Sequence, residues 1–209
     1  MKRYIKCVDS REDYERLAFS GEAWDRQEAA GDPDTPADIL TALAFDPDIA
    51  VRYSIAANPS TPPETLRDLA TEPDIGLIGE LTYNDNLDAE AISIIYDRWH
   101  YDYSICYNIA TLPNAPEDVL EKLAQHDSWS IRRCVAENSR TPARLLERLA
   151  QDSDIDVIQG VVQNSNTPQN LLIHLAETTK SYKVLVTLYR YCLDPAVLEI
   201  IDQRIQESR

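Results

Sequence analysis

A repeated start signal constrains this chain more than any other feature. Four Thr-Pro pairs recur along it, and Ala115-Pro116 and Leu87-Asp88 fill the two gaps, so that successive starts lie 26, 26, 28, 26 and 26 residues apart. The four pairs are Thr35-Pro36, Thr61-Pro62, Thr141-Pro142 and Thr167-Pro168. A period in this range is typical of a solenoid, in which each unit can bury its apolar face only against its neighbours.

Each repeat begins with the pattern of a short amphipathic helix. We expect the threonine to be the N-cap, the proline to be the first helical residue, and an acidic residue three positions after the threonine to complete a capping box. These acidic residues are Asp38, Glu64, Glu90 and Asp118. An apolar stripe follows at helical spacing, as in Ile39, Leu40, Leu43 and Ala44.

A second helix is predicted in every repeat. It starts after a column of N-cap residues and has aliphatic residues three and seven positions later, which gives it one buried edge. The cap column is Asp48, Asp74, Asp102, Ser128, Asp154 and Ser181. Ten residues after the cap, Asn58, Asn84, Asn138 and Asn164 recur, and we interpret them as helix ends in the left-handed conformation.

These stretches resemble the leucine-rich repeat variant proteins, which are related to HEAT-like helical arrays. The resemblance covers roughly residues 32 to 195, for example Asn58-Pro59-Ser60-Thr61-Pro62 followed by Leu66 and Leu69-Ala70. It implies a superhelix of alternating α and 3₁₀ helices, with an iron–sulfur cluster held by clustered cysteines near the N-terminus. The four cysteines here are scattered, so no cluster and no other cofactor is expected; they are Cys7, Cys106, Cys134 and Cys192.

The predicted fold is therefore an all-α, right-handed α-solenoid of about six two-helix repeats, each about 26 residues long. We expect one continuous domain, with capping helices in residues 1–31, the repeat array in residues 32–195 and a capping helix in residues 196–209. Ser10 and Asp13 form a capping box for the first helix, and a second helix carries Trp24. Whether the shorter helix of each pair is α or 3₁₀ stays open.

Charge and composition narrow the possible functions. The net charge is −16, of which −15 lies on residues 32–209, and such a surface should repel nucleic acid and attract basic partners. The first seven residues show no signal peptide, no segment is apolar enough to span a membrane, and unclustered cysteines fit a reducing cytoplasm. His100, His126 and His174 form no metal-site spacing, and no catalytic motif is present, so we expect neither an enzyme nor a metal site.

The outward face of the second helices supplies the candidate binding residues. Positions five and nine residues after the cap point away from the buried edge, and folding does not require aromatic residues there. We predict a partner-binding stripe on a concave surface, made of Tyr53, Tyr83, Tyr107 and Arg133. Trp99 and Tyr101, beside the insertion in the third repeat, either add an aromatic contact or fill a gap in the stacking.

Other conspicuous residues have structural interpretations. The acidic pairs Asp46/Asp48 and Asp152/Asp154 belong to helix ends and caps rather than to metal or acid–base sites. Arg52 and Arg132 share a column, where they either bind a partner or form an ion pair with a cap carboxylate of the same or an adjacent repeat. Tyr103 and Trp129 stand in a column that is hydrophobic throughout, so we assign both to the core.

Three functions remain as hypotheses. The first is a non-enzymatic interaction scaffold that binds a protein or peptide on a concave helical surface, where the acidic charge favours a basic partner. The second is an acidic mimic of nucleic-acid charge that sequesters a basic DNA-binding protein. The third is a HEAT-like module that binds nucleic acid directly, which the acidic surface disfavours.

Overall fold

The computed structural model describes residues 10–192 and 194–207. Residues 1–7, for which no signal peptide is predicted and which include Cys7, lie outside the described residues. This part of the chain contains 15 α-helices and no strand, which confirms the all-α prediction. The helices alternate between two layers, and both helices of each repeat are α-helices. The helices form two compact units, residues 1–100 and residues 101–209.

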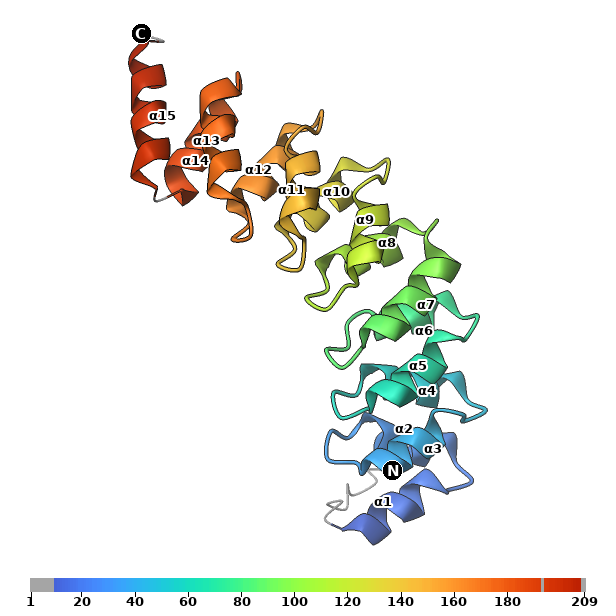
Figure 1. Cartoon of the computed structure of the whole chain (residues 1–209). Coiled ribbons are helices and arrows are strands. Elements are labelled where there is room, and N and C mark those ends of the chain that lie inside the picture. The colour runs from blue at the N-terminus through green and yellow to red at the C-terminus, as the bar shows by residue number, and fades with distance from the viewer. Residues whose placement is uncertain (1–9, 193, 208–209) are drawn as a thin grey trace. The chain divides into compact units, whose positions relative to one another are not determined.

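Unit 1 stacks pairs of short antiparallel helices, drawn from blue to green in Figure 1. Its first layer contains α1 (Arg11–Ala18), α3 (Ala37–Leu43), α5 (Pro63–Ala70) and α7 (Ala89–Trp99). Its second layer contains α2 (Ala23–Gly31), α4 (Ile49–Ala57) and α6 (Ile75–Leu81). Successive second-layer helices pack on one another, α2 on α4 and α4 on α6.

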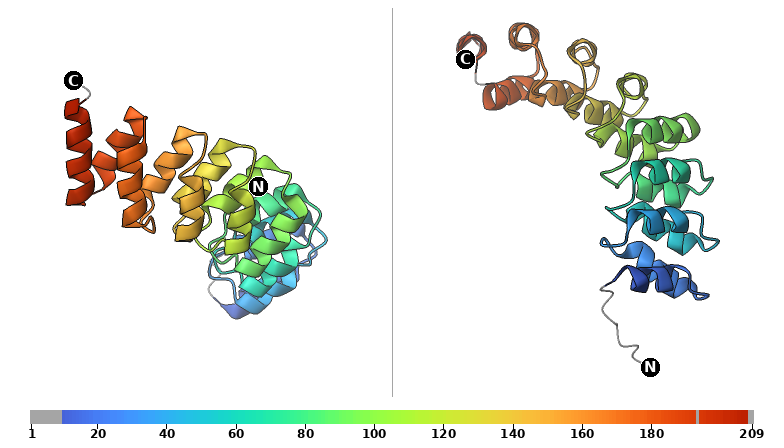
Figure 2. Two further views of the ribbon diagram at one scale, coloured as in Figure 1. Left: turned by 45° about the horizontal axis from the view of Figure 1, so that its top comes forward. Right: turned by 60° about the horizontal axis from the view of Figure 1, so that its bottom comes forward.

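Unit 2 repeats the arrangement. Its second layer contains α8 (Tyr103–Thr111), α10 (Trp129–Glu137), α12 (Ile155–Gln163) and α14 (Tyr182–Tyr191). Its first layer contains α9 (Glu117–Leu123), α11 (Ala143–Leu149), α13 (Gln169–Thr178) and α15 (Pro195–Glu207). In the right view of Figure 2 the first-layer helices of unit 2 are seen end-on, and the second layer lies below them.

The core consists of the aliphatic columns that the sequence predicts. In the second helices, the residues three and seven positions after the cap are all at most 2% exposed. They are Val51, Leu77, Ile105, Ile131, Val157 and Val184, with Ile55, Leu81, Ile109, Val135, Val161 and Leu188. The cap column is also confirmed, because five of its six side chains accept a hydrogen bond from the first turn of their helix.

The threonine of each Thr-Pro pair is not the N-cap that the sequence predicts. The proline has the extended backbone of the cap, and the threonine hydroxyl instead donates to a carbonyl six residues earlier, at the end of the preceding helix. Thr61 Oγ1, for example, lies 2.7 Å from the Ile55 carbonyl oxygen, and Thr61 is fully buried. The hydroxyl thus satisfies one of the carbonyls that a helix end leaves unpaired.

The capping-box prediction for the following acidic residues is also wrong at Asp38 and Glu90. Thr35 is turned toward the preceding helix, and the helix of Glu90 is capped by Asp88 instead. Both carboxylates bind an arginine of the preceding repeat. Asp38 pairs with Arg11, and Glu90 lies 2.8 Å from Arg67. Both pairs are exposed, so each contributes little to stability.

The recurrent asparagines end their helices without a left-handed residue. No residue in the described part of the chain has a positive φ, and Asn138 has φ −68° and ψ 127°. Its buried amide nitrogen lies 2.8 Å from the carbonyl oxygens of both Ala110 and Leu112, at the end of the preceding second-layer helix. Asn58, Asn84 and Asn164 make the equivalent pair of bonds. The column therefore joins consecutive repeats.

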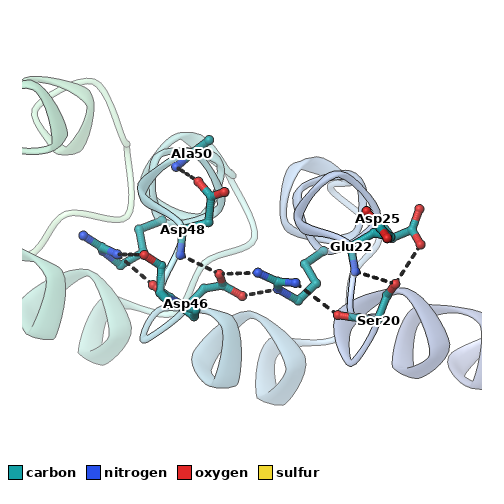
Figure 3. Close-up of polar contacts among 9 residues, drawn as sticks. Ser20, Glu22, Asp25, Asp46, Asp48 and Ala50 are labelled. Atoms are coloured by element: carbon teal, nitrogen blue, oxygen red, sulfur yellow. Dashed lines mark hydrogen bonds and ion pairs between the residues drawn. The ribbon is translucent and has the colours of Figure 1, made fainter.

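Arginine–carboxylate pairs form a second connection between repeats. Arg132 lies 2.7 Å from Asp152 and Arg26 lies 2.5 Å from Asp46, in both cases with the carboxylate in the next repeat; Figure 3 shows Asp46 with its partners. The side chains are 5% to 15% exposed. Arg52, predicted together with Arg132, lies 3.8 Å from Glu72 of the next repeat. Both predicted arginines thus pair with the adjacent repeat, although each carboxylate stands two residues before the cap and is not the cap itself.

Replacing Asn138 with alanine should lower the unfolding free energy by about 2 to 3 kcal/mol, because two buried carbonyls lose their donor. Urea unfolding followed by circular dichroism measures the change. The exposed Asn166, whose amide lies 2.6 Å from the Ser139 carbonyl oxygen, serves as the control. Asn166→Ala should cost less than about 1 kcal/mol, and an equal loss in both variants would contradict the role given to the buried column.

The pair of Arg132 and Asp152 should make stability depend on pH. Arg132 lowers the pKa of Asp152, so the stabilisation is complete above the pKa of an unfolded aspartate, near ~3.9, and is lost as the pH falls through the folded value. Asp152→Asn should therefore lose roughly 2 kcal/mol of unfolding free energy at neutral pH and approach the wild type below about pH 4. Urea unfolding across pH tests this, with the exposed Glu147→Gln as the control; parallel curves for wild type and Asp152→Asn would refute it.

Candidate functional site

A row of large apolar side chains lies exposed on the second layer of unit 2. It consists of the first residue of each helix, namely Tyr103, Trp129, Ile155 and Tyr182, which are 51%, 44%, 39% and 73% exposed. We call these four residues the apolar row. The assignment of Tyr103 and Trp129 to the core is therefore wrong.

Helix geometry explains the error. At about 100° per residue, the first position of a second helix lies about 140° from the mean direction of the two buried columns, on the same side as the fifth position. A column that is apolar throughout can thus face solvent. The direction of a residue around the helix axis, rather than its hydrophobicity, identifies this exposed face from the sequence.

Tyrosine contacts join α8 to α10 within this face. The rings of Tyr103 and Tyr107 stack with centroids 6.1 Å apart, and the Tyr103 hydroxyl lies 2.9 Å from Ser130 Oγ. The electrostatic interaction with Cys134, followed by a hydrogen bond to the same residue, raises the pKa of the Tyr107 hydroxyl. Tyr107 is a predicted site residue, 40% exposed, and it extends the apolar row along α8.

A glycine brings the next two helices together. A Cβ on Gly160 would lie 3.0 Å from the Ala136 side chain and 3.2 Å from the Arg133 carbonyl oxygen, so only glycine allows α12 to approach α10 this closely. Trp129 and Ile155 begin these two helices. The close packing therefore sets the spacing of the middle of the apolar row.

The charges on this face are largely paired. The predicted site residue Arg133 lies 2.8 Å from Glu137 on the same helix, and Lys183 on α14 forms an ion pair with Asp156 on α12. The net charge of the chain lies mainly elsewhere, because residues 1–100 hold 21 acidic and 9 basic side chains (net −12) and residues 101–209 hold 15 and 11 (net −4). The apolar row thus belongs to the less acidic unit.

A groove of about 340 Å³ opens on the same face between α12 and α14. Its lining consists of Gln159, Gln163, Tyr182, Lys183, Val186, Thr187, Arg190 and Tyr191. Tyr182, at the end of the apolar row, forms part of it. The groove is therefore continuous with the row.

In unit 1, the predicted site residues Tyr53 and Tyr83 differ from each other. The Tyr53 hydroxyl donates to Asp74 Oδ1 at 2.8 Å and passes over Gly76, where a Cβ would lie 2.1 Å from that hydroxyl oxygen. This bond raises the pKa of Tyr53 and gives the side chain a structural role between α4 and α6. Tyr83 lies in the turn after α6 and is 73% exposed.

The insertion in the third repeat lies in a helix rather than in a loop. It lengthens the first-layer helix, since α7 has 11 residues and α5 has 8. Trp99 is the half-buried last residue of α7, with the Arg98 guanidinium 5.9 Å from its ring centroid. Tyr101 is 70% exposed and belongs to unit 2.

The buried cysteines of the described residues are not reactive nucleophiles. Cys106, Cys134 and Cys192 are buried, and burial raises the pKa of the Cys106 thiol to about 11 and also raises that of Cys134. Such thiols are protonated at neutral pH and are poor nucleophiles. Among the described residues, no group of three His, Cys, Asp or Glu side chains is arranged to hold a metal ion.

The helices of residues 10–192 and 194–207 include none with the length and apolar character that a membrane crossing needs.

The comparisons with known proteins concern the fold. No family description matches the sequence, and no curated protein matches it. One solved structure that matches is titled "a leucine-rich repeat variant with a novel repetitive protein structural motif". The match covers 87% of this chain and 71% of the other chain, with 22% sequence identity and a TM-score of 0.59. The chain has the fold of a leucine-rich repeat variant. Two engineered proteins also match, at 15% and 17% identity and TM-scores of 0.41 and 0.33, over 93% and 95% of this chain and 67% and 96% of theirs.

The three cysteines in the described part of the chain do not fit the iron–sulfur cluster that the resemblance to leucine-rich repeat variants implies. Cys106 lies on α8, Cys134 on α10 and Cys192 after α14, each buried within its own repeat. A cluster needs cysteine thiolates gathered around one point. The three described cysteines of this leucine-rich repeat variant fold are therefore not arranged to hold such a cluster.

Replacing Trp129 with serine should change the unfolding free energy by less than about 1 kcal/mol, because the side chain is exposed. A core tryptophan would cost about 3 to 5 kcal/mol. Urea unfolding distinguishes the two positions, and the fully buried Ile131→Ala provides the core reference on the same helix. A loss in Trp129→Ser as large as that in Ile131→Ala would contradict the exposed placement.

Proposed function

We propose that this chain is a non-enzymatic scaffold that binds a protein or peptide segment on the second-layer face of unit 2. The observation that carries the proposal is the apolar row, in which every second-layer helix of unit 2 presents a large exposed apolar residue at the same position. Folding does not require these side chains to be apolar. Exposed aromatic residues that recur on one face are typical of interaction surfaces.

The spacing of the apolar row favours an extended peptide. Packed helices lie about 8 to 10 Å apart, so the row offers one apolar contact at about that interval. An extended chain advances about 3.3 Å per residue, and every third residue of a peptide crossing the helices would meet a member of the row. Tyr107 and Arg133 stand beside these contacts and complete the binding face; Tyr53, Tyr83, Trp99 and Tyr101 remain candidates for further contacts.

The charge distribution supports a second candidate, sequestration of a basic nucleic-acid-binding protein. Residues 1–100 carry a net charge of −12, which would attract a cationic partner over long range. Such a complex should weaken steeply as the salt concentration rises. It should also be insensitive to changes in the apolar row of unit 2, so one set of variants distinguishes the two candidates.

A variant with serine in place of Tyr103, Trp129 and Tyr182 should bind peptide at least about tenfold more weakly than the wild type, because it loses three of the four apolar contacts. The ligands are peptides selected on the wild-type chain from a random display library. Fluorescence anisotropy of labelled peptides measures the dissociation constants. Circular dichroism and urea unfolding verify that the variant is folded.

The control replaces Phe19 and Phe45, which are 71% and 68% exposed but lie at first-layer helix ends in unit 1. Serine at these two positions should leave the dissociation constants unchanged. Equal affinity of the wild type and the folded triple variant would refute the proposed face. The selection of no peptide above background would refute peptide binding itself.

A further inference from the structure

We propose that the groove between α12 and α14 receives a carboxylate-bearing peptide segment, with an apolar side chain of the same segment held against Tyr182 and Val186. This inference rests on the proposed function, because it assigns a partner chemistry to one end of the same face. Such a segment contrasts with the basic partner that the net charge of the whole chain suggests.

The groove is defined by one stripe of α14. Tyr182, Val186 and Arg190 are spaced four residues apart, so they follow one another along one side of the helix. At 1.5 Å per residue the stripe extends about 12 Å from the tyrosine to the arginine. The groove therefore offers apolar contact at one end and a positive charge at the other.

Charge complementarity identifies the group that fits the positive end. The lining contains two cations, Lys183 and Arg190, and no carboxylate. Lys183 is already paired with Asp156, whereas no hydrogen bond or ion pair engages the exposed Arg190 within the described part of the chain. The planar guanidinium of an arginine can donate two parallel hydrogen bonds to one carboxylate.

The remaining lining suits a peptide. Gln163 is an exposed amide that can both donate to and accept from a peptide backbone, and Gln159 is held in place by its bond to Thr187 Oγ1 at 2.5 Å. Tyr191, which is 54% exposed, lines the groove beside Arg190, so each end of the groove has an aromatic side chain. A few convergent polar groups among apolar walls are typical of a site that orients its ligand.

A peptide carboxylate fits this groove better than the phosphates of a nucleic acid. A nucleic acid carries a charge at every phosphate, and along its length it would meet the net charge of −16 on this chain. A short segment with one or two carboxylates meets Arg190 locally and experiences far less repulsion. The apolar row next to the groove also requires side chains that a peptide supplies.

The experiment uses the full chain and the display-selected peptides introduced above. The selected sequences should contain an acidic residue close to an aromatic or aliphatic one, and changing that acid to its amide should weaken binding at least about tenfold in fluorescence anisotropy. Arg190→Glu should weaken the acidic peptide by a similar factor and remove its advantage over the amide analogue. A short labelled oligothymidylate is measured in parallel.

Arg140→Glu is the matched control, since Arg140 is also an exposed arginine of unit 2 but lies in the turn after α10, outside the groove. It makes the same change in net charge and should leave both peptides unaffected. Peptides that bind through Trp129 without preferring an acid would overturn this inference and leave the proposed function standing. An equal effect of Arg190→Glu and Arg140→Glu, or tighter binding of the oligothymidylate than of the peptide, would also overturn it.

Discussion

Consecutive repeats are held in register by side chains that bind the backbone at the end of the preceding second-layer helix. At the end of α2, for example, the buried Asn58 donates to two carbonyls and Thr35, the threonine of the next Thr-Pro pair, donates to a third. A helix of nine residues leaves four carbonyls without an intrahelical partner, and buried carbonyls need donors. The repeat thus supplies in its sequence what the short helix cannot supply for itself.

The parts of the fold that follow from periodicity could be predicted from the sequence. Aliphatic columns such as the one containing Val51 identify the buried edge, and the column of N-cap residues that contains Asp74 identifies helix starts, because both depend on residues close in sequence. The role of Asn138 could not be predicted, since its partners lie 26 and 28 residues earlier in the chain. A local pattern shows that a polar residue ends a helix, but it does not show which carbonyl the side chain reaches.

The candidate site was predicted in part for a related reason. The direction of their positions from the helix axis identifies Tyr107 and Arg133, and both lie beside the apolar row. The hydrophobic composition of its column assigns Trp129 to the core, although its direction places it on the same exposed side. The groove beside Tyr182 depends on how closely α12 and α14 pack, and that distance is a property of the tertiary structure.

The asparagine column gives the array a direction. Each amide binds the repeat before it, as Asn164 binds carbonyls of Ala136 and Asn138, so all these bonds run in the same direction along the chain. Shortening such an array from its C-terminal end exposes carbonyls that water can satisfy. Shortening it from the N-terminal end instead exposes an asparagine amide, which water can also satisfy. The two ends of such an array therefore differ in chemistry, because one presents hydrogen-bond acceptors and the other presents donors.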